Sequence, residues 1–275
     1  MMSTFALFLL GLTVGTFGTL IGAGGGFLLV PVLLILYPRL EPEVVTAISL
    51  AVVFLNATSG SVAYGRMKKT DYRTGWVFAA ATVPGAVLGV FAVRSLSRWG
   101  FDLIFGTLLL LLSLYLMIFP QPTLTRAAWR RLGCQLWPVS RTVVDARGER
   151  YNYTFCMGTG IIASFVVGFV SSLLGIGGGI IHVPVLIHLL DFPPHVATAT
   201  SHFILAIMAL AGCLTHLLQG TYTGVIPLTL TIGGGAVIGA QVGAWLSHQV
   251  SGVAIVRALG LALGVVGLRL LLLSI

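Results

Sequence analysis

The chain has 275 residues, of which 57% are hydrophobic and only 8% are charged, and its mean hydropathy is +1.04. A water-soluble domain of this length carries about three times as much charge, so the composition excludes a soluble domain and predicts a polytopic membrane protein. The formal net charge is +8. Arginine and lysine gather in a few connecting segments, as positive charge does when it orients a membrane protein. We therefore expect a lipid bilayer, and no nucleic acid, as a partner.

Eight apolar blocks follow one another along the chain, each long enough to cross a hydrocarbon core of about 30 Å. They span residues 4–37, 44–65, 75–93, 101–119, 153–190, 196–218, 222–246 and 253–273. The first and fifth blocks are too long for one straight helix. We expect an all-α membrane fold in three parts. These are an N-terminal membrane repeat over residues 1–119, a basic cytoplasmic loop over 120–152 and a C-terminal membrane repeat over 153–275.

The two overlong blocks contain the same interruption. Residues 22–26 read GAGGG, residues 175–179 read GIGGG, and 153 positions separate the two copies. Glycine inside a helix costs about 1 kcal/mol relative to alanine, so four glycines in five positions predict a broken helix. In lipid, a break is tolerated only where protein or a water-filled cavity satisfies the freed backbone groups. Matching breaks in two halves of a chain indicate the binding site of a transporter.

Further matches support a duplicated unit. Gly85–Gly89 corresponds to Gly235–Gly239 at a separation of 150 positions, and Ser49 corresponds to Ser201 at 152.

The basic loops after the second and fourth blocks lie on one side of the membrane, which should be cytoplasmic. If each broken block crosses once, there are eight crossings and parallel halves. If each doubles back, there are ten crossings, external termini and inverted halves. The charges fit both, and we favour inverted repeats because they are common in secondary transporters.

Each break is expected to contact an anion. A helix that starts after a break presents unpaired N–H groups and the positive end of its dipole, and glycine lets an oxyanion approach the backbone closely. Tight packing is the alternative, because small residues line helix contacts in membranes, and we assign Gly11, Gly15 and Gly85 to packing. The glycines expected to contact the anion are Gly24, Gly25, Gly26, Gly177, Gly178 and Gly179.

Polar residues inside the second, sixth and seventh blocks are the next candidates, because polar groups in membrane segments are costly and often functional. Hydroxyl, amide and imidazole groups can replace the hydration shell of an oxyanion. Hydrogen bonding between helices, or to the preceding turn, is the alternative for each residue. The residues expected to bind the substrate are Ser49, Asn56, Ser59, Thr200, Ser201, His202 and Gln241.

His182 and His202 are also candidates for carrying a proton coupled to transport, with a structural histidine as the alternative. His202 is expected to face the second break. Its counterpart Leu50 is apolar, so the site should be lopsided toward the second half. No aspartate or glutamate lies well inside a block, so a carboxylate proton relay or a sodium site is not expected. The three cysteines form no CxxC pair, and we expect no metal and no cofactor.

The paired motifs GAGGGFLLVPVLL (residues 22–34) and GIGGGIIHVPVLI (residues 175–187) resemble the TauE/SafE sulfite exporter family. The two-half pattern covers nearly the whole chain apart from the central loop. The resemblance implies movement of sulfur-containing oxyanions, such as sulfite or organosulfonates, usually outward across the inner membrane. The halves depart from each other. Ile48 stands where the second half has Thr200, and the first half has no match for His182 or His202.

We therefore expect a secondary transporter of a small anion rather than an enzyme, with two halves that rock around a midplane site. An anion channel is an alternative that the sequence leaves open. An integral membrane enzyme is a weaker one, because no cluster of His, Asp or Glu has ligand spacing and no Ser-His-Asp arrangement can be assembled. A homodimer is compatible with the sequence.

Overall fold

The computed structural model describes residues 3–118, 137–247 and 252–273. This part of the chain is mostly helical, and seven of its helices are long and apolar enough to cross a membrane. They are α1 (Thr4–Ile21), α3 (Pro42–Arg66), α4 (Tyr72–Val93), α5 (Arg98–Ile118), α7 (Met157–Leu174), α9 (Pro194–Leu218) and α10 (Ile226–Leu246). A further helix, α11 (Gly252–Leu273), follows α10. The predicted blocks match these helices to within a few residues, except at the start of the fifth block.

Both overlong blocks are broken at the predicted glycines. The first break ends α1 at Gly22, and α2 (Gly26–Leu36) begins four residues later. The second break ends α7 at Gly175, and α8 (Gly179–Pro184) begins at the same distance and continues into the π-helical turn η1 (Val185–Leu189). Each overlong block is therefore a long helix followed by a short one.

Helices from the two halves of the sequence pack in an exchanged order. The first helix of each half packs along the fourth helix of the other half, α1 with α10 and α7 with α4. Their backbones approach closely through small residues. A Cβ added to Gly15 would lie 2.5 Å from the carbonyl oxygen of Ala236, and one added to Gly168 would overlap the carbonyl of Thr82. Gly11 and Gly85 approach the backbone of Ile232 and Phe165 in the same way, so packing accounts for the three glycines that we assigned to it.

The third helices, α3 and α9, pack against each other in opposite directions. Near the start of α3, the hydroxyl of Tyr222, which follows α9, donates to the carbonyl of Ala47 at 2.9 Å. Toward the end of α3, Gly60 lies against the ring of His202, which is two turns into α9. The pair α5 and α11 also runs in opposite directions, since Ser113 lies close to Gly260 and Gly106 lies close to Gly267.

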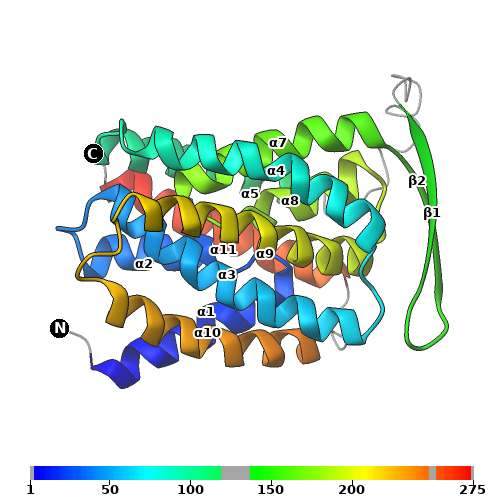
Figure 1. The fold of residues 1–275 in the computed structure, drawn as a ribbon, viewed down its shortest axis with the longest axis horizontal. Helices are drawn as coiled ribbons and strands as arrows, with labels where there is room; N and C mark the ends of the chain where they lie inside the picture. Colours follow the sequence, from blue (N-terminus) through cyan, green and yellow to red (C-terminus); the bar gives the residue numbers. More distant parts are fainter. Residues whose placement is uncertain (1–2, 119–136, 248–251, 274–275) are drawn as a thin grey trace.

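One part of the fold differs from the all-α expectation. Residues 119–136, including Arg126, Arg130 and Arg131, lie outside the described residues. The next segment forms an antiparallel hairpin of β1 (Pro138–Val144) and β2 (Arg150–Cys156). The predicted loop over 120–152 therefore contains a strand. The predicted fifth block begins too early, because the apolar run at residue 153 belongs to β2. Figure 1 shows the hairpin at one end of the bundle and both chain termini at the other.

Aromatic residues at alternate positions explain why β2 is a strand rather than the start of a membrane helix. Side chains two residues apart share one face of a strand, and Tyr153 and Phe155 are both buried. They contact Phe192, with ring centroids 4.4 and 5.1 Å apart, and Phe155 also contacts Phe78 of α4. The hairpin is thereby packed onto the helical bundle.

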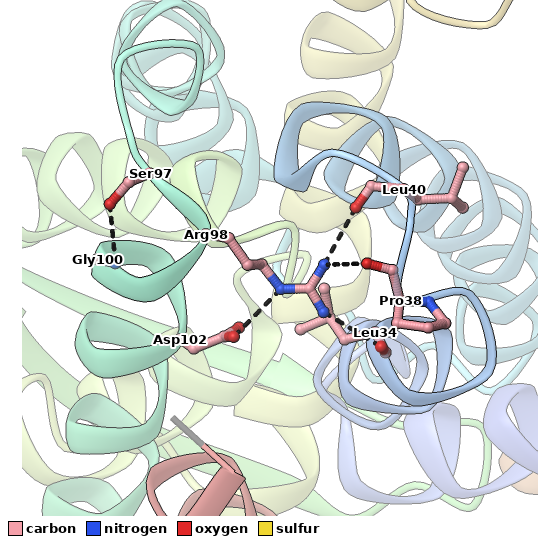
Figure 2. Close-up of polar contacts among 7 residues, drawn as sticks. All are labelled: Leu34, Pro38, Leu40, Ser97, Arg98, Gly100 and Asp102. Carbon is pink, nitrogen blue, oxygen red and sulfur yellow. Dashed lines mark hydrogen bonds and ion pairs between the residues drawn. The ribbon is translucent and has the colours of Figure 1, made fainter. Parts of the chain in front are cut away.

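A single arginine fixes the end of α2 against α5. Figure 2 shows the guanidinium of Arg98 pointing toward the segment between α2 and α3. It donates to the carbonyl oxygens of Leu34 and Leu40, each at 3.1 Å, and to that of Pro38 at 3.5 Å, while its Nε donates to Asp102 at 3.1 Å. The last carbonyls of a helix have no intrahelical donor. Arg98 satisfies one of them, that of Leu34, and holds the segment that follows the short helix.

Candidate functional site at the paired glycine breaks

The two glycine breaks have the same backbone conformation. In the first, φ is +84°, +76° and +83° at Gly22, Gly24 and Gly25. In the second, the corresponding glycines at positions 175, 177 and 178 have φ of +68°, +80° and +81°. L-residues rarely adopt this left-handed region. Three such positions within four residues therefore explain why the sequence carries glycine there in both copies.

The breaks lie against each other near the middle of the bundle. A Cβ added to Gly26 would lie 2.7 Å from the carbonyl oxygen of Gly175, and one added to Gly179 would overlap the carbonyl of Gly22. Gly177 approaches Val53, which is at mid-length in α3. In a bundle that spans a membrane, this level is the midplane.

Serines from the third helices connect the two breaks. Ser49 of α3 donates to the carbonyl of Gly175 at 2.5 Å, and Ser201 of α9 donates to the carbonyl of Gly22 at 3.4 Å. Both serines are fully buried. Each half therefore braces the break of the other, and both hydroxyl protons are already used by the backbone.

The first break has a polar network around it. Thr19, one turn before the break, donates to Asn56 Oδ1 at 3.2 Å, and Asn56 Nδ2 donates to the carbonyl of Gly24 at 3.2 Å. The hydroxyl of Tyr64 donates to the carbonyl of Thr19 at 2.8 Å, and His202 Nε2 lies 3.3 Å from Thr19 Oγ1. His202 therefore faces the first break, and the expectation that it faces the second is wrong. The sequence could not show this, because it depends on the packing of α9 against α3, which places His202 beside Gly60 and Thr19.

The second break has a different set of residues at the equivalent positions. Ser171 and Ser172 correspond to Gly18 and Thr19 at a separation of 153 positions. His216 corresponds to Tyr64 at 152 positions. All three residues are fully buried, and in the described part of the chain no hydrogen-bond partner is found for either serine hydroxyl or for either ring nitrogen of His216. Ser171 Oγ would lie 3.1 Å from a Cβ on Gly178, so it is directed at the break. The Ser171 hydroxyl at the second break is thus without a partner among the described residues, whereas the ring of His216 lies beside Tyr222, with 6.5 Å between the ring centroids.

The first backbone N–H groups after each break are also free. Such groups have no acceptor within their own helix. Among the described residues, none accepts a hydrogen bond from the N–H of Gly26, Phe27, Gly179 or Ile180. Both breaks therefore direct unpaired donors to the place where the two breaks meet.

Three of the predicted substrate-binding residues lie away from the breaks. Gln241 of α10 donates to the hydroxyl of Ser59 at 2.7 Å, on an exposed seam between α10 and α3. Thr200 accepts the N–H of Asp71 at 3.0 Å and so positions the start of α4. These contacts fit the structural alternative that we stated for each of them. His182 is buried beside Ser164, with 3.2 Å between the ring Nε2 and the hydroxyl.

Sequence reasoning missed Thr19, Ser171 and Ser172. They lie in the last turn before each break, whereas the polar residues that we selected lie in the second, sixth and seventh blocks. The signal was present, because Thr19 and Ser172 are both hydroxyl residues at the 153-residue separation of the glycine motif. Among the described residues, no group of three or more His, Cys, Asp and Glu side chains could hold a metal ion.

A bundle of apolar helices, two of them broken at matching positions, is the architecture of a multi-pass membrane transporter. The chain belongs to the TauE/SafE sulfite exporter family, whose family model matches residues 7–270.

Curated relatives from distant organisms are also described as membrane transporters. The probable membrane transporter protein YunE of Bacillus subtilis is 34% identical over 276 residues, covering 98% of each chain. A probable membrane transporter protein of Methanocaldococcus jannaschii is 23% identical over 97% of this chain and 94% of its own length. A third, from Xylella fastidiosa, is 25% identical over 84% of this chain and 80% of its own length. No solved structure was found to match the chain.

Proposed function

We propose that this protein is a secondary transporter that moves a small sulfur-containing oxyanion, sulfite or an organosulfonate, outward across the inner membrane by alternating access. The name of the family supports the substrate class. The observation that carries the proposal is the contact between two glycine breaks at mid-length in α3, with unpaired N–H groups directed at their junction. Helix starts at the midplane are where transporters bind anionic groups.

The anion is held mainly by the second break. Around the first break, Thr19, Asn56 and Nε2 of His202 bond to one another or to the backbone, and Nδ1 of His202 is left without a partner. At the second break, neither the Ser171 nor the Ser172 hydroxyl has a partner among the described residues. Hydrogen bonds to a charged ligand are stronger than those between neutral groups. We assign the strongest contacts to two hydroxyls and to the backbone N–H groups that begin the second short helix. These groups belong to Ser171, Ser172, Gly178, Gly179 and Ile180. The first break then contacts the opposite side of the anion.

The proposed topology is an inverted repeat of the helices α1 to α5 and the helices α7 to α11. In an inverted repeat, equivalent helices run in opposite directions across the membrane, and the opposed directions of α3 and α9 and of α5 and α11 support that arrangement. The position of α2 supports a broken block that doubles back. The C-terminal end of α2 leads into the start of α3, which lies at the same end of the bundle as the start of α10. α1 runs parallel to α10 and therefore also starts at this end. The chain thus enters through α1 and returns through α2 to the end where it began. The basic hairpin end is then cytoplasmic and the termini are external.

The exchanged packing changes which parts can move. Two halves that rock as rigid bodies would have to separate α1 from α10 and α7 from α4, which touch backbone to backbone. Close-packed contacts resist gradual deformation. We therefore propose that these mixed pairs move as units past the central pair of α3 and α9.

The test uses the purified full-length protein in liposomes. Sulfite flux should be saturable, and internal sulfite should accelerate the entry of labelled external sulfite, which distinguishes a carrier from a channel. Removing both hydroxyls with Ser171→Ala and Ser172→Ala should lower the apparent affinity about a hundredfold or more, because each of the two hydrogen bonds to a charged group contributes about 1.5–3 kcal/mol. Thr13→Ala, which removes an exposed hydroxyl bonded within its own helix, is the control. Flux that is linear in sulfite concentration, or unchanged in the double variant, would contradict the proposal.

A further inference from the structure

A pocket of about 380 Å³ lies at the hairpin end of the bundle, away from the glycine breaks. Four segments enclose it: the last turn of α3, the connection from α3 to α4, the last turns of α10 and the turn between β1 and β2. The hairpin turn is held in place by a hydrogen bond from the N–H of Ala146 to the carbonyl of Met67 at 3.0 Å. The pocket is therefore built from segments that are far apart in the sequence.

The charges that line this pocket are unbalanced. Arg66, Lys69 and Arg147 contribute three cations, and Asp145 contributes one carboxylate. The Oδ1 atom of this carboxylate accepts the backbone N–H groups of Arg147 at 2.8 Å and Glu149 at 3.0 Å. Asp145 and the neighbouring Glu149 offset part of the positive charge that acts on Lys69. Three cations and one carboxylate still leave the lining itself with an excess of positive charge, which favours an anion.

Lys69 is the central group. Its side chain is 8% exposed, yet it lines the pocket, and within the described part of the chain it makes no ion pair. Burial lowers its pKa, and the neighbouring Asp145 offsets that effect only in part. A bound oxyanion would supply the ion-pair partner that the Lys69 ammonium group lacks among the described residues.

The walls of the pocket are partly apolar. Trp245 is 61% exposed beside it, and Ala63 and Ala244 form its inner surface and pack on Tyr64. A ligand with a compact anionic group and a short apolar part fits this lining.

We infer that this pocket is a second anion site, which binds an oxyanion group through Arg66, Lys69 and Arg147. The same chemistry is offered by a soluble sulfonate, sulfate or phosphate and by the headgroup of an anionic lipid. The site does not depend on the glycine breaks, and its binding can be measured without any transport.

The test uses the full-length protein in two settings. In detergent free of anionic lipid, sulfite, sulfate and inorganic phosphate are titrated by calorimetry. In nanodiscs, retention of phosphatidylglycerol is compared with that of phosphatidylcholine. The variants are Lys69→Gln and Arg66→Gln, with Lys69→Arg to restore the charge. Arg73→Gln is the matched control, because Arg73 is exposed at the same end but does not line the pocket.

We expect the Gln variants to weaken binding of one probe at least about tenfold, the change produced by loss of one hydrogen bond to a charged group, and Lys69→Arg and Arg73→Gln to bind like wild type. Loss confined to soluble anions identifies a small-molecule site, and loss confined to phosphatidylglycerol identifies a lipid site. Arg66 is exposed, so its variant should fold even if the Lys69 variant does not. If both folded Gln variants bind all probes like wild type, the inference is wrong. If Ser171→Ala with Ser172→Ala removes all anion binding, only the break site exists.

Discussion

Ser49 and Ser201 are 152 positions apart in the sequence, and each donates a hydrogen bond to the first glycine carbonyl of the other half's break, Gly175 and Gly22 respectively. The Ser49 bond is 2.5 Å long and the Ser201 bond is 3.4 Å. The same contact is thus made twice across the molecule. Five predictions follow from this arrangement and from the packing around it.

Ser49→Ala should destabilise the protein more than Ser201→Ala. The shorter bond is the stronger one, and its loss leaves a buried carbonyl without a donor. We expect a decrease in the free energy of unfolding of about 0.6–1.5 kcal/mol for Ser49→Ala. Thermal unfolding of both variants in detergent, with Thr13→Ala as an exposed control, measures the difference. Equal stability of Ser49→Ala and wild type would show that the brace contributes nothing.

Gly26→Ala and Gly179→Ala should each prevent assembly of the site. The added methyl group would press on the backbone of the opposite break, which cannot turn aside as a side chain can. Overpacking of this kind costs about 1–3 kcal/mol or more. Gly234→Ala is the matched control, because a Cβ there meets nothing nearer than 3.9 Å and alanine favours a helix. The yield of monodisperse protein after extraction should fall for the first two variants and hold for the third.

His202→Ala should affect stability more than anion affinity. The imidazole contacts Thr19 and packs edge-on against Tyr64 at a centroid distance of 5.4 Å, so its loss opens the network behind the first break. Calorimetric titration with sulfite should show a larger loss of affinity for Ser171→Ala with Ser172→Ala than for His202→Ala. A reversed order, with a larger His202 effect near pH 6 than near pH 8, would make the imidazole a ligand, as the sequence suggested.

A cross-link between α1 and α10 should leave transport intact if the mixed pairs move as units. Phe8 lies beside Gly234, where there is room for a side chain. Phe8→Cys with Gly234→Cys, in a background without the native cysteines, can be joined by a short bifunctional thiol reagent. Sulfite flux in liposomes should persist after joining. Flux that stops on joining and recovers when a cleavable linker is cut would show that α1 slides against α10.

Labelling of cysteines in intact cells should reveal the orientation. In the same cysteine-free background, Ser3→Cys should react with a membrane-impermeant thiol reagent added outside, because α1 begins at the end opposite the hairpin (Figure 1). Ser140→Cys, on the exposed face of the hairpin, should react only after the cells are opened. Reaction of Ser140→Cys from outside would reverse the proposed topology.

The glycine breaks could be predicted from the sequence because their cause is local. A run such as Gly175–Gly179 breaks a helix wherever it stands, and its copy in the first half marks both positions at once. The helix bounds followed from apolar length for the same reason. The hairpin could not be predicted in this way. Its second strand carries Tyr153 and Phe155, and an aromatic run at the edge of an apolar block looks like the first turn of a membrane helix.

The partners of the polar residues could not be predicted either, because they depend on which helices meet. Ser59 and Gln241 were selected as polar residues inside membrane blocks that could bind the substrate, yet they bond to each other on an exposed seam. His202 was placed by its own half of the sequence, yet it contacts Thr19 of the other half. A period of 3.6 residues tells which side chains share a face, and only the tertiary fold tells what that face meets.

The exchanged packing also constrains the synthesis of the protein. The glycine face of α1 enters the membrane first, but its partner α10 begins about 200 residues later along the chain. At about 5–20 residues per second, that interval lasts about 10–40 s. During this time α1 can meet only lipid, other nascent helices or an assisting insertase. If synthesis ends before residue 226, α1 has no native partner in the truncated chain. Such a chain should be a substrate for membrane proteases.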